Sequence, residues 1–219
     1  MKLSKSKLGS LILERLKQEY PKLPRSFLNH SNPFELLVAT VLSAQCTDDR
    51  VNKATPLLFK EAPNPEAMKK IGVGRIKELI KSINFFNNKA TALWNLSVNL
   101  IEKHQSQVPQ TLEELVALPG VGRKTANVVL GNAFNTPGMV VDTHVLRISN
   151  RLKFSKSSDP EKTEQDLMLI FPENEWVELS HRFILLGRNL CKAQKTLCKM
   201  CFLVDICPSA FKNPKEWKN

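Results

Sequence analysis

The spacing of apolar residues along the chain predicts helices almost throughout. From Leu8 to Tyr20, apolar residues recur every three or four positions, which is the period of one face of a helix. Comparable amphipathic stretches are found at 34–44, 77–83, 89–101, 143–152 and 174–190. No segment alternates apolar and polar residues for long enough to form a strand, and Met139-Val140-Val141 is too brief to anchor a sheet. The sequence therefore predicts an all-α fold.

Capping residues and prolines mark where several of these helices begin. Ser31-Asn32-Pro33 and Asn64-Pro65-Glu66 each place a capping side chain before a proline suited to a first helical turn. Thr111-Leu112-Glu113-Glu114 has the spacing of a capping box, which predicts a short helix to Ala117. Asp159-Pro160-Glu161 is expected to open another helix.

Breaks rich in proline, asparagine and glycine divide the chain into two predicted domains. They fall near Pro21 to Pro24 and at Asn135-Thr136-Pro137-Gly138. We expect one domain over residues 26–136. The second is expected to combine residues 1–25 with residues 137–219, so that both ends of the chain contribute to it.

The charge of the chain favours a polyanionic partner. Its 219 residues include 32 lysines and arginines against 21 acidic residues, a net charge of +11. From Arg188 to Asn219 there are seven positive and two negative residues, so part of this excess is local. Such a surface attracts nucleic acid, although a merely soluble basic protein would show the same balance. The first residues are too soon interrupted by charge for a signal peptide, and no stretch approaches a membrane span. We therefore expect a cytoplasmic protein without membrane contact.

A glycine-rich turn between two short helices is the first candidate binding site. It reads Leu118-Pro119-Gly120-Val121-Gly122-Arg123-Lys124-Thr125-Ala126. Its glycines permit positive φ, and the amides at the start of the second helix favour an anion such as a DNA phosphate. A tight turn that only holds two helices together is the alternative. A second copy, Lys70-Ile71-Gly72-Val73-Gly74-Arg75-Ile76, has isoleucine where the first has Lys124, and we interpret it as structural.

Four cysteines form a candidate metal site. Cys191, Cys198, Cys201 and Cys207 are separated by six, two and five residues. In a reducing compartment such a group is a metal site rather than a disulfide framework. Four thiolates can hold zinc or an iron–sulfur cluster, and the spacing alone favours zinc. Cys46 lies apart and is expected to be an unligated, partly buried thiol.

Taken together, these motifs resemble the endonuclease III family. The resemblance runs from Leu42-Ser43-Ala44-Gln45-Cys46-Thr47-Asp48 through the glycine-rich turn and Val141-Asp142-Thr143-His144-Val145 to the cysteines. It implies two helical domains with a DNA cleft between them. Residues 26–136 would form a six-helix barrel with a helix-hairpin-helix at about 112–132, and the other domain would carry a [4Fe–4S] cluster on the four cysteines.

The resemblance also implies a catalytic pair, Lys124 and Asp142. Cleaving a base from its sugar requires a nucleophile at the anomeric carbon, and an amine leaves a Schiff base that permits elimination of the 3′ phosphate. Taken by residue type alone, Lys124 could simply contact phosphate and Asp142 could be a helix N-cap. By resemblance, Lys124 is the Schiff-base lysine and Asp142 the catalytic aspartate. His144 is expected to pack or to contact phosphate rather than to act as a base.

The resemblance assigns DNA contacts as well. Gln45 would fill the gap left by an evicted base, and Phe85 stands where the family has an apolar intercalating residue. Further contacts are expected at Asn87, Gly120, Val121, Gly122, Arg123 and Lys195. The chain departs from the family's usual Ile-Gly-Leu-Tyr-Asn-Ser-Lys-Ala by placing Asn84 at the glycine, and asparagine tolerates left-handed backbone. Gln194 and Leu197 also replace residues that are often basic, which predicts a weaker grip on phosphate.

The expected function is that of a bifunctional DNA N-glycosylase and AP lyase of base excision repair. It would remove damaged, chiefly oxidised, pyrimidines from double-stranded DNA and cut 3′ to the abasic site as a monomer, associated with the nucleoid in a bacterium. A monofunctional mismatch glycosylase of the same superfamily is one alternative. A non-catalytic helix-hairpin-helix module with structural zinc is the other, and it leaves the pairing of Lys124 with Asp142 unexplained.

Overall fold

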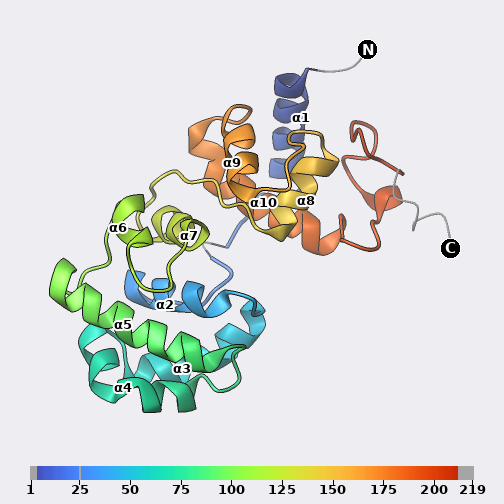
Figure 1. Ribbon diagram of the computed structural model, residues 1–219. Coiled ribbons are helices and arrows are strands. Elements are labelled where there is room, and N and C mark those ends of the chain that lie inside the picture. Colours follow the sequence, from blue (N-terminus) through green and yellow to red (C-terminus); the bar gives the residue numbers. More distant parts are fainter. Residues whose placement is uncertain (1–3, 25, 212–219) are drawn as a thin grey trace. The chain divides into compact units, whose positions relative to one another are not determined.

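The computed structural model describes residues 4–24 and 26–211, and all regular elements in that part of the chain are helices (Figure 1). The prediction of an all-α fold is confirmed. The chain folds as two compact units. Unit 1 comprises Met1–Leu23 and Pro137–Asn219, and unit 2 comprises Pro24–Thr136. No helix in the described ranges is long and apolar enough to cross a membrane.

Unit 2 is built around one helix that is buried along most of its length. Its elements are α2 (Pro33–Ser43), α3 (Asp48–Glu61), α4 (Pro65–Leu79), α5 (Phe86–His104), α6 (Leu112–Val116) and α7 (Arg123–Ala133). Every residue of α2 from Phe34 to Leu42 is buried, as expected for a helix that is apolar on all sides. Helices α3, α5 and α7 all pack against α2. The core of unit 2 therefore surrounds α2.

The helix starts predicted from capping residues are confirmed. Asn32 accepts a hydrogen bond from the Glu35 amide at 2.9 Å, and Asn64 does the same for Ala67. Thr111 accepts from the Glu114 amide at 3.3 Å, and its hydroxyl donates to the Glu114 carboxylate at 2.7 Å. Each cap satisfies an amide that has no acceptor within its own helix.

Two stretches of unit 2 differ from the sequence-based expectation. Helix α3 was not predicted, although Val51, Ala54, Thr55 and Leu58 form its buried stripe at helical spacing. Its polar character and the internal Pro56 conceal that stripe. The helix expected over residues 77–83 is instead the end of α4, which stops at Leu79, so that Ile83 lies in a turn.

Unit 1 combines a helix from the beginning of the chain with the segment after Pro137. Its elements are α1 (Lys5–Glu19), α8 (Thr143–Arg151), α9 (Pro160–Met168), η1 (Glu173–Glu175), α10 (Trp176–Asn189) and η2 (Cys198–Met200). Figure 1 shows α1 in blue beside the yellow and orange helices α8, α9 and α10. Ile12 and Leu16 of α1 are fully buried, and Arg15 donates to Asp205 at 2.8 Å. Helix α1 is thus an integral part of unit 1.

Candidate nucleic-acid interface and active site

The turn between α6 and α7 depends on a glycine. Gly120 has φ +78°, a backbone conformation that other residues rarely adopt. A Cβ at this position would lie 3.2 Å from the Cβ of Ala92, so the turn also packs closely against α5. Val121 is buried, and its amide donates to the Leu118 carbonyl at 3.1 Å. The Val121 amide therefore closes the turn.

Helix α7 begins with amides that suit an anion. Gly122 is its N-cap residue and has no side chain to accept from the first turn. The amides of that turn have no acceptor within the helix, and the helix dipole gives this end a partial positive charge. Arg123 and Lys124 are the first two residues of α7, and both are exposed. This arrangement can bind a phosphate and present an amine beside it.

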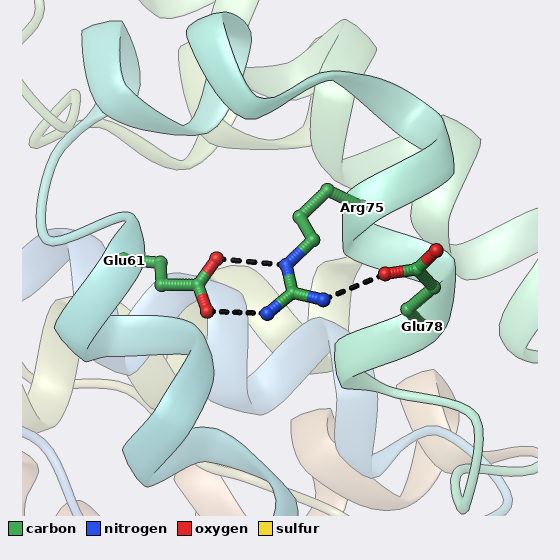
Figure 2. Close-up of polar contacts among 3 residues, drawn as sticks. All are labelled: Glu61, Arg75 and Glu78. Carbon is green, nitrogen blue, oxygen red and sulfur yellow. Dashed lines mark hydrogen bonds and ion pairs between the residues drawn. The ribbon is translucent and has the colours of Figure 1, made fainter.

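The second glycine turn lies within α4 and has a different environment. Gly72 interrupts α4 with φ +74°, and the residue corresponding to Lys124 is Ile76, which is fully buried. The residue corresponding to Arg123 is Arg75, which lies between two carboxylates (Figure 2). Its guanidinium donates to Glu61 at 2.7 and 2.9 Å and to Glu78 at 2.6 Å. The charge of Arg75 is therefore neutralised within the protein.

Asp142 is the N-cap of α8 in unit 1. Its Oδ1 accepts hydrogen bonds from the amides of His144 and Val145, both at 2.8 Å. Neither of these two bonds involves Oδ2. The cap therefore fixes the orientation of the carboxylate through Oδ1 alone. His144 lies 3.2 Å from an Arg147 Nη2 through its Nδ1, and burial lowers the pKa of the imidazole. His144 is thus half-buried beside Arg147, as expected for a residue that packs, and its exclusion from the catalytic pair stays a prediction.

Two exposed loops in unit 2 carry the residues that resemble base-flipping wedges. Gln45 follows α2 with φ +53°, and Phe85 precedes α5 with φ +56°. Both side chains are exposed, and Phe85 keeps 61% of its surface accessible. Asn87 is exposed in the first turn of α5. In this loop the positive φ falls at Phe85 and not at Asn84, the position of the family's usual glycine.

The four clustered cysteines line one cavity in unit 1. The cavity has a volume of about 470 Å³, and its wall includes Cys191, Cys198, Cys201 and Cys207 together with apolar residues such as Leu186 and Leu203. Burial raises the pKa of Cys201 to about 11 and raises that of Cys207 as well. A bound metal cation favours the thiolate form of such cysteines, because it offsets the cost of burying their charge. Within the described residues, no three His, Cys, Asp or Glu side chains form a group that could hold one metal ion.

Two arginines of α8 hold the loop that begins at Cys191. Arg151 donates to the Cys191 sulfur and carbonyl oxygen, both at 3.2 Å, and to the Lys192 carbonyl at 2.7 Å. Arg147 donates to the Cys191 carbonyl at 3.1 Å and to the Gly187 carbonyl at 3.0 Å. A side chain at Gly187 would collide with Arg147, so this glycine lets α10 approach α8. Lys195 is exposed on the same loop.

These features are shared with a known family of proteins. A model of the HhH-GPD superfamily of base excision DNA repair proteins matches residues 38–173. Endonuclease III of Synechocystis sp. is 47% identical over 208 residues, 94% of each chain, and endonuclease III of Escherichia coli is 45% identical over 90% of this chain and 92% of its own.

The chain belongs to the endonuclease III family of the HhH-GPD superfamily. Among solved structures, a trapped endonuclease III–DNA covalent intermediate matches with a TM-score of 0.90 at 42% identity, covering 96% of this chain and 98% of that one. A thermostable thymine-DNA glycosylase matches with a TM-score of 0.79 at 22% identity, which shows a shared fold. The chain is accordingly an enzyme of base excision repair, a DNA glycosylase with AP lyase activity.

Several residues that shape these sites were missed by sequence reasoning. Arg147 and Arg151 were not expected at the cysteine loop, and their five- and nine-residue distance from Asp142 gives no signal of it. Lys89 is buried under the Gln45 loop, where its Nζ donates to the Leu42 and Ala44 carbonyls at 2.8 and 2.6 Å. Desolvation lowers the pKa of Lys89.

Proposed function

We propose that this enzyme removes damaged pyrimidines from double-stranded DNA by means of Lys124 and Asp142, and that oxidised pyrimidines are its main substrates. The observation that carries this proposal is the position of Lys124. It is an exposed amine at the anion-binding start of α7, in a chain that is 45–47% identical to endonuclease III proteins. Monomeric action at the bacterial nucleoid is part of the same proposal, because the substrate is chromosomal DNA.

In the proposed reaction, the Lys124 Nζ attacks C1′ of the damaged nucleotide. The N-glycosidic bond breaks, the base leaves with the bonding electrons and a proton, and the sugar ring opens to a Schiff base on Lys124. The imine draws electrons from C2′, which loses a proton, and the 3′ phosphate departs by β-elimination. Hydrolysis of the imine then frees Lys124 and leaves a 3′ unsaturated aldehyde.

Asp142 serves the same sugar in this proposal. It accepts the proton that Lys124 must lose before it can attack, and its negative charge stabilises the positive charge that develops on the sugar. Support comes from the cap geometry, because two amides hold Oδ1 and leave Oδ2 outside those bonds. A carboxylate that is already fixed loses little entropy when it engages the substrate.

Binding of the duplex is proposed to rest on backbone as much as on charge. The start of α7 would hold a phosphate through the amides of Arg123 and its neighbours, with Gly120, Val121 and Gly122 setting the turn that presents them. Gln45 and Phe85 would enter the base stack, with Asn87 beside them. Lys195 would contact phosphate from the cysteine loop. None of these contacts reads a base sequence, as suits an enzyme that searches for damage.

The cavity lined by the four cysteines fits a [4Fe–4S] cluster. Four sulfur ligands spread around about 470 Å³ leave room for a group of several atoms, whereas a single zinc ion needs its sulfurs at about 2.3 Å from one point. When bound, the cluster would tie the four cysteines together and supply the cations that keep them ionised. Arg147 and Arg151 donate hydrogen bonds to backbone carbonyls at the start of the loop. These bonds would fix the loop that carries Lys195.

The test is a strand-cleavage assay on two duplexes, one with dihydrouracil and one with a single abasic site. We expect cleavage of both, a 3′ unsaturated aldehyde, and a covalent protein–DNA complex when borohydride is present. Removal of the base without strand cleavage would instead identify a monofunctional glycosylase. Binding without either reaction would contradict the proposed function altogether. Iron and sulfide content of the purified protein tests the cluster, which stoichiometric zinc without iron would refute.

A further inference from the structure

The two wedge loops share an unusual backbone feature. Gln45 and Phe85 both have φ near +55°, although neither is glycine, and left-handed backbone is unfavourable for side chains of this kind. Such conformations persist only when surrounding contacts hold them, and they gather at functional sites. The contacts that hold these two residues therefore bear on how the loops work.

Asn84 supplies a direct link between the two loops. Its Nδ2 donates to the Gln45 carbonyl at 2.7 Å, and its Oδ1 accepts from Arg50 Nη1 at 2.8 Å. A carbonyl can only accept and a guanidinium can only donate, so the two partners fix which way the amide group points. The side chain next to Phe85 is thus bonded to the backbone of Gln45. Glycine, the usual residue here in the family, has no side chain that could do this.

Lys89 continues the same connection beneath the surface. Its Nζ donates to the carbonyls of Leu42 and Ala44 at the end of α2. Carbonyls in the last turn of a helix receive no hydrogen bond from an amide of the same helix. Asn84 and Lys89 lie five residues apart and bind three carbonyls between Leu42 and Gln45. The segment that carries Phe85 therefore caps the segment that carries Gln45.

We propose that Asn84 is a positioning residue that makes the two wedge loops enter the duplex as one body. This inference rests on the proposed function, because it presupposes that Gln45 and Phe85 occupy the space of an evicted base. In the proposed function, both Gln45 and Phe85 enter the stack when the base is extruded. With the amide bridge, ordering one loop orders the other. Without it, only the bonds of the buried Lys89 join the two segments, and the exposed Gln45 and Phe85 have to be ordered separately on the DNA.

The experiment compares base excision with cleavage at a ready-made abasic site. Under single-turnover conditions, Asn84→Ala is expected to slow excision of dihydrouracil about tenfold, the effect of losing two hydrogen bonds. Cleavage of a duplex that already contains an abasic site should change less than about twofold, because a nucleotide without a base is far easier to extrude. Equal slowing on both duplexes, or no slowing on either, would overturn the proposal.

Two further variants test the bridge: a matched control elsewhere on α5, and a substitution of Arg50, the other side chain bonded to Asn84. Asn95 is an exposed asparagine on α5, and Asn95→Ala should leave both rates unchanged. Arg50→Met removes one bond of the bridge, so its effect on the excision-to-lyase ratio should be smaller than that of Asn84→Ala. Adding it to Asn84→Ala should cause no further change in that ratio, since the bridge is already absent. Full additivity in the double variant would contradict the bridge.

A measurement without substrate separates this inference from the proposed function. The Cys46 amide donates to the Ser43 carbonyl at 3.0 Å inside the Gln45 loop. Hydrogen exchange at this amide should become about tenfold faster in Asn84→Ala and not in Asn95→Ala, while the chain still unfolds in one cooperative transition. An unchanged exchange rate refutes the bridge even if the wild-type enzyme acts as proposed. An enzyme inactive on both duplexes refutes the proposed function, whatever the exchange rates are.

Discussion

The turn within α4 and the turn before α7 have nearly the same backbone and opposite surroundings. Each has a glycine with positive φ, at +74° for Gly72 and +78° for Gly120, and each continues into a helix through Gly-Arg. After the first turn, Ile76 is buried in the core and Arg75 binds two carboxylates. After the second turn, Lys124 is exposed.

This contrast shows that the backbone conformation of a hairpin and its ability to bind phosphate are separate properties. A positive-φ glycine lets the chain turn sharply between helices, which is useful whether or not DNA is nearby. What makes a phosphate site is an exposed helix start, where the amides of the first turn and the helix dipole favour an anion. In the first turn, Arg75 forms ion pairs with Glu61 and Glu78. Ile76, which is apolar, occupies the position that corresponds to Lys124. The following predictions test that distinction.

The largest effect is expected at the amine. Lys124→Gln should abolish borohydride trapping and slow cleavage of an abasic duplex at least about 10³-fold, because no other group is proposed to form the Schiff base. Lys70→Gln changes the exposed lysine that opens the first turn, and it should leave trapping intact. Trapping that persists in Lys124→Gln would remove Lys124 from the mechanism.

The next effect concerns the free energy of unfolding. Here a substitution after the first turn should have the larger effect, and one after the second turn the smaller. Ile76→Ala empties a fully buried position and should lower the free energy of unfolding by about 2–4 kcal/mol. Lys124→Ala alters an exposed position and should change that energy by no more than about 0.5 kcal/mol. Urea unfolding followed by circular dichroism measures both. Similar losses for the two variants would show that the turns are anchored alike.

The glycines should differ in how well they tolerate a methyl group. Gly120→Ala adds a Cβ 3.2 Å from Ala92 to an already unfavourable φ, for a loss of about 2 kcal/mol. At Gly72 nothing lies within 4 Å of the added Cβ, so only the backbone strain of about 1 kcal/mol remains. The same unfolding experiment compares them. A larger loss at Gly72 would mean that close packing does not distinguish the turns.

A smaller effect is expected in the salt dependence of DNA binding. Arg123→Met should reduce the slope of log K against log salt by about one, the value for one lost phosphate contact. Arg75→Met should leave the slope unchanged, because Glu61 and Glu78 already neutralise that guanidinium. Fluorescence anisotropy on an undamaged duplex at several salt concentrations provides the slopes. Equal reductions would place both arginines on the DNA.

The smallest effect is confined to pH. The hydrogen bonds from Arg75 hold the pKa of Glu61 below its ordinary value. A carboxyl with a lowered pKa stabilises the fold above its unfolded-state pKa, and the contribution is lost as pH falls through the folded-state pKa. In Arg75→Met the pKa of Glu61 should return to its ordinary range, and the variant should differ in stability from wild type near neutral pH but not in acid. Carboxyl NMR titration of Glu61 checks this, and an unchanged pKa would contradict the ion pair.

The sequence predicted the parts of this molecule that depend on neighbours along the chain. The helix caps at Thr111, Asn32 and Asn64 are local patterns, and all three are found in the structure. Helix α3 was missed because Pro56 usually ends a helix, although tertiary packing of Leu58 and its neighbours keeps it intact. Local propensity gave way there to burial.

Contacts between distant segments could not be predicted in the same way. Glu78 is three residues from Arg75 and could have been paired with it, but Glu61 lies fourteen residues away on another helix. The Asn84 side chain donates to the Gln45 carbonyl, thirty-nine residues earlier, and no local pattern in the sequence indicates that contact. The proposed cooperation of Lys124 with Asp142 likewise depends on tertiary structure, because eighteen positions separate them along the chain.

The discontinuity of unit 1 has a consequence for how the protein is made. Unit 2 is a single stretch and can fold as soon as it has left the ribosome. Helix α1 is synthesised earlier, but the partners of Ile12 and Leu16 come from beyond Pro137. At ordinary translation rates that wait lasts on the order of ten seconds. During this interval the apolar stripe of α1, which includes Ile12 and Leu16, lacks the segment that buries it in the folded protein.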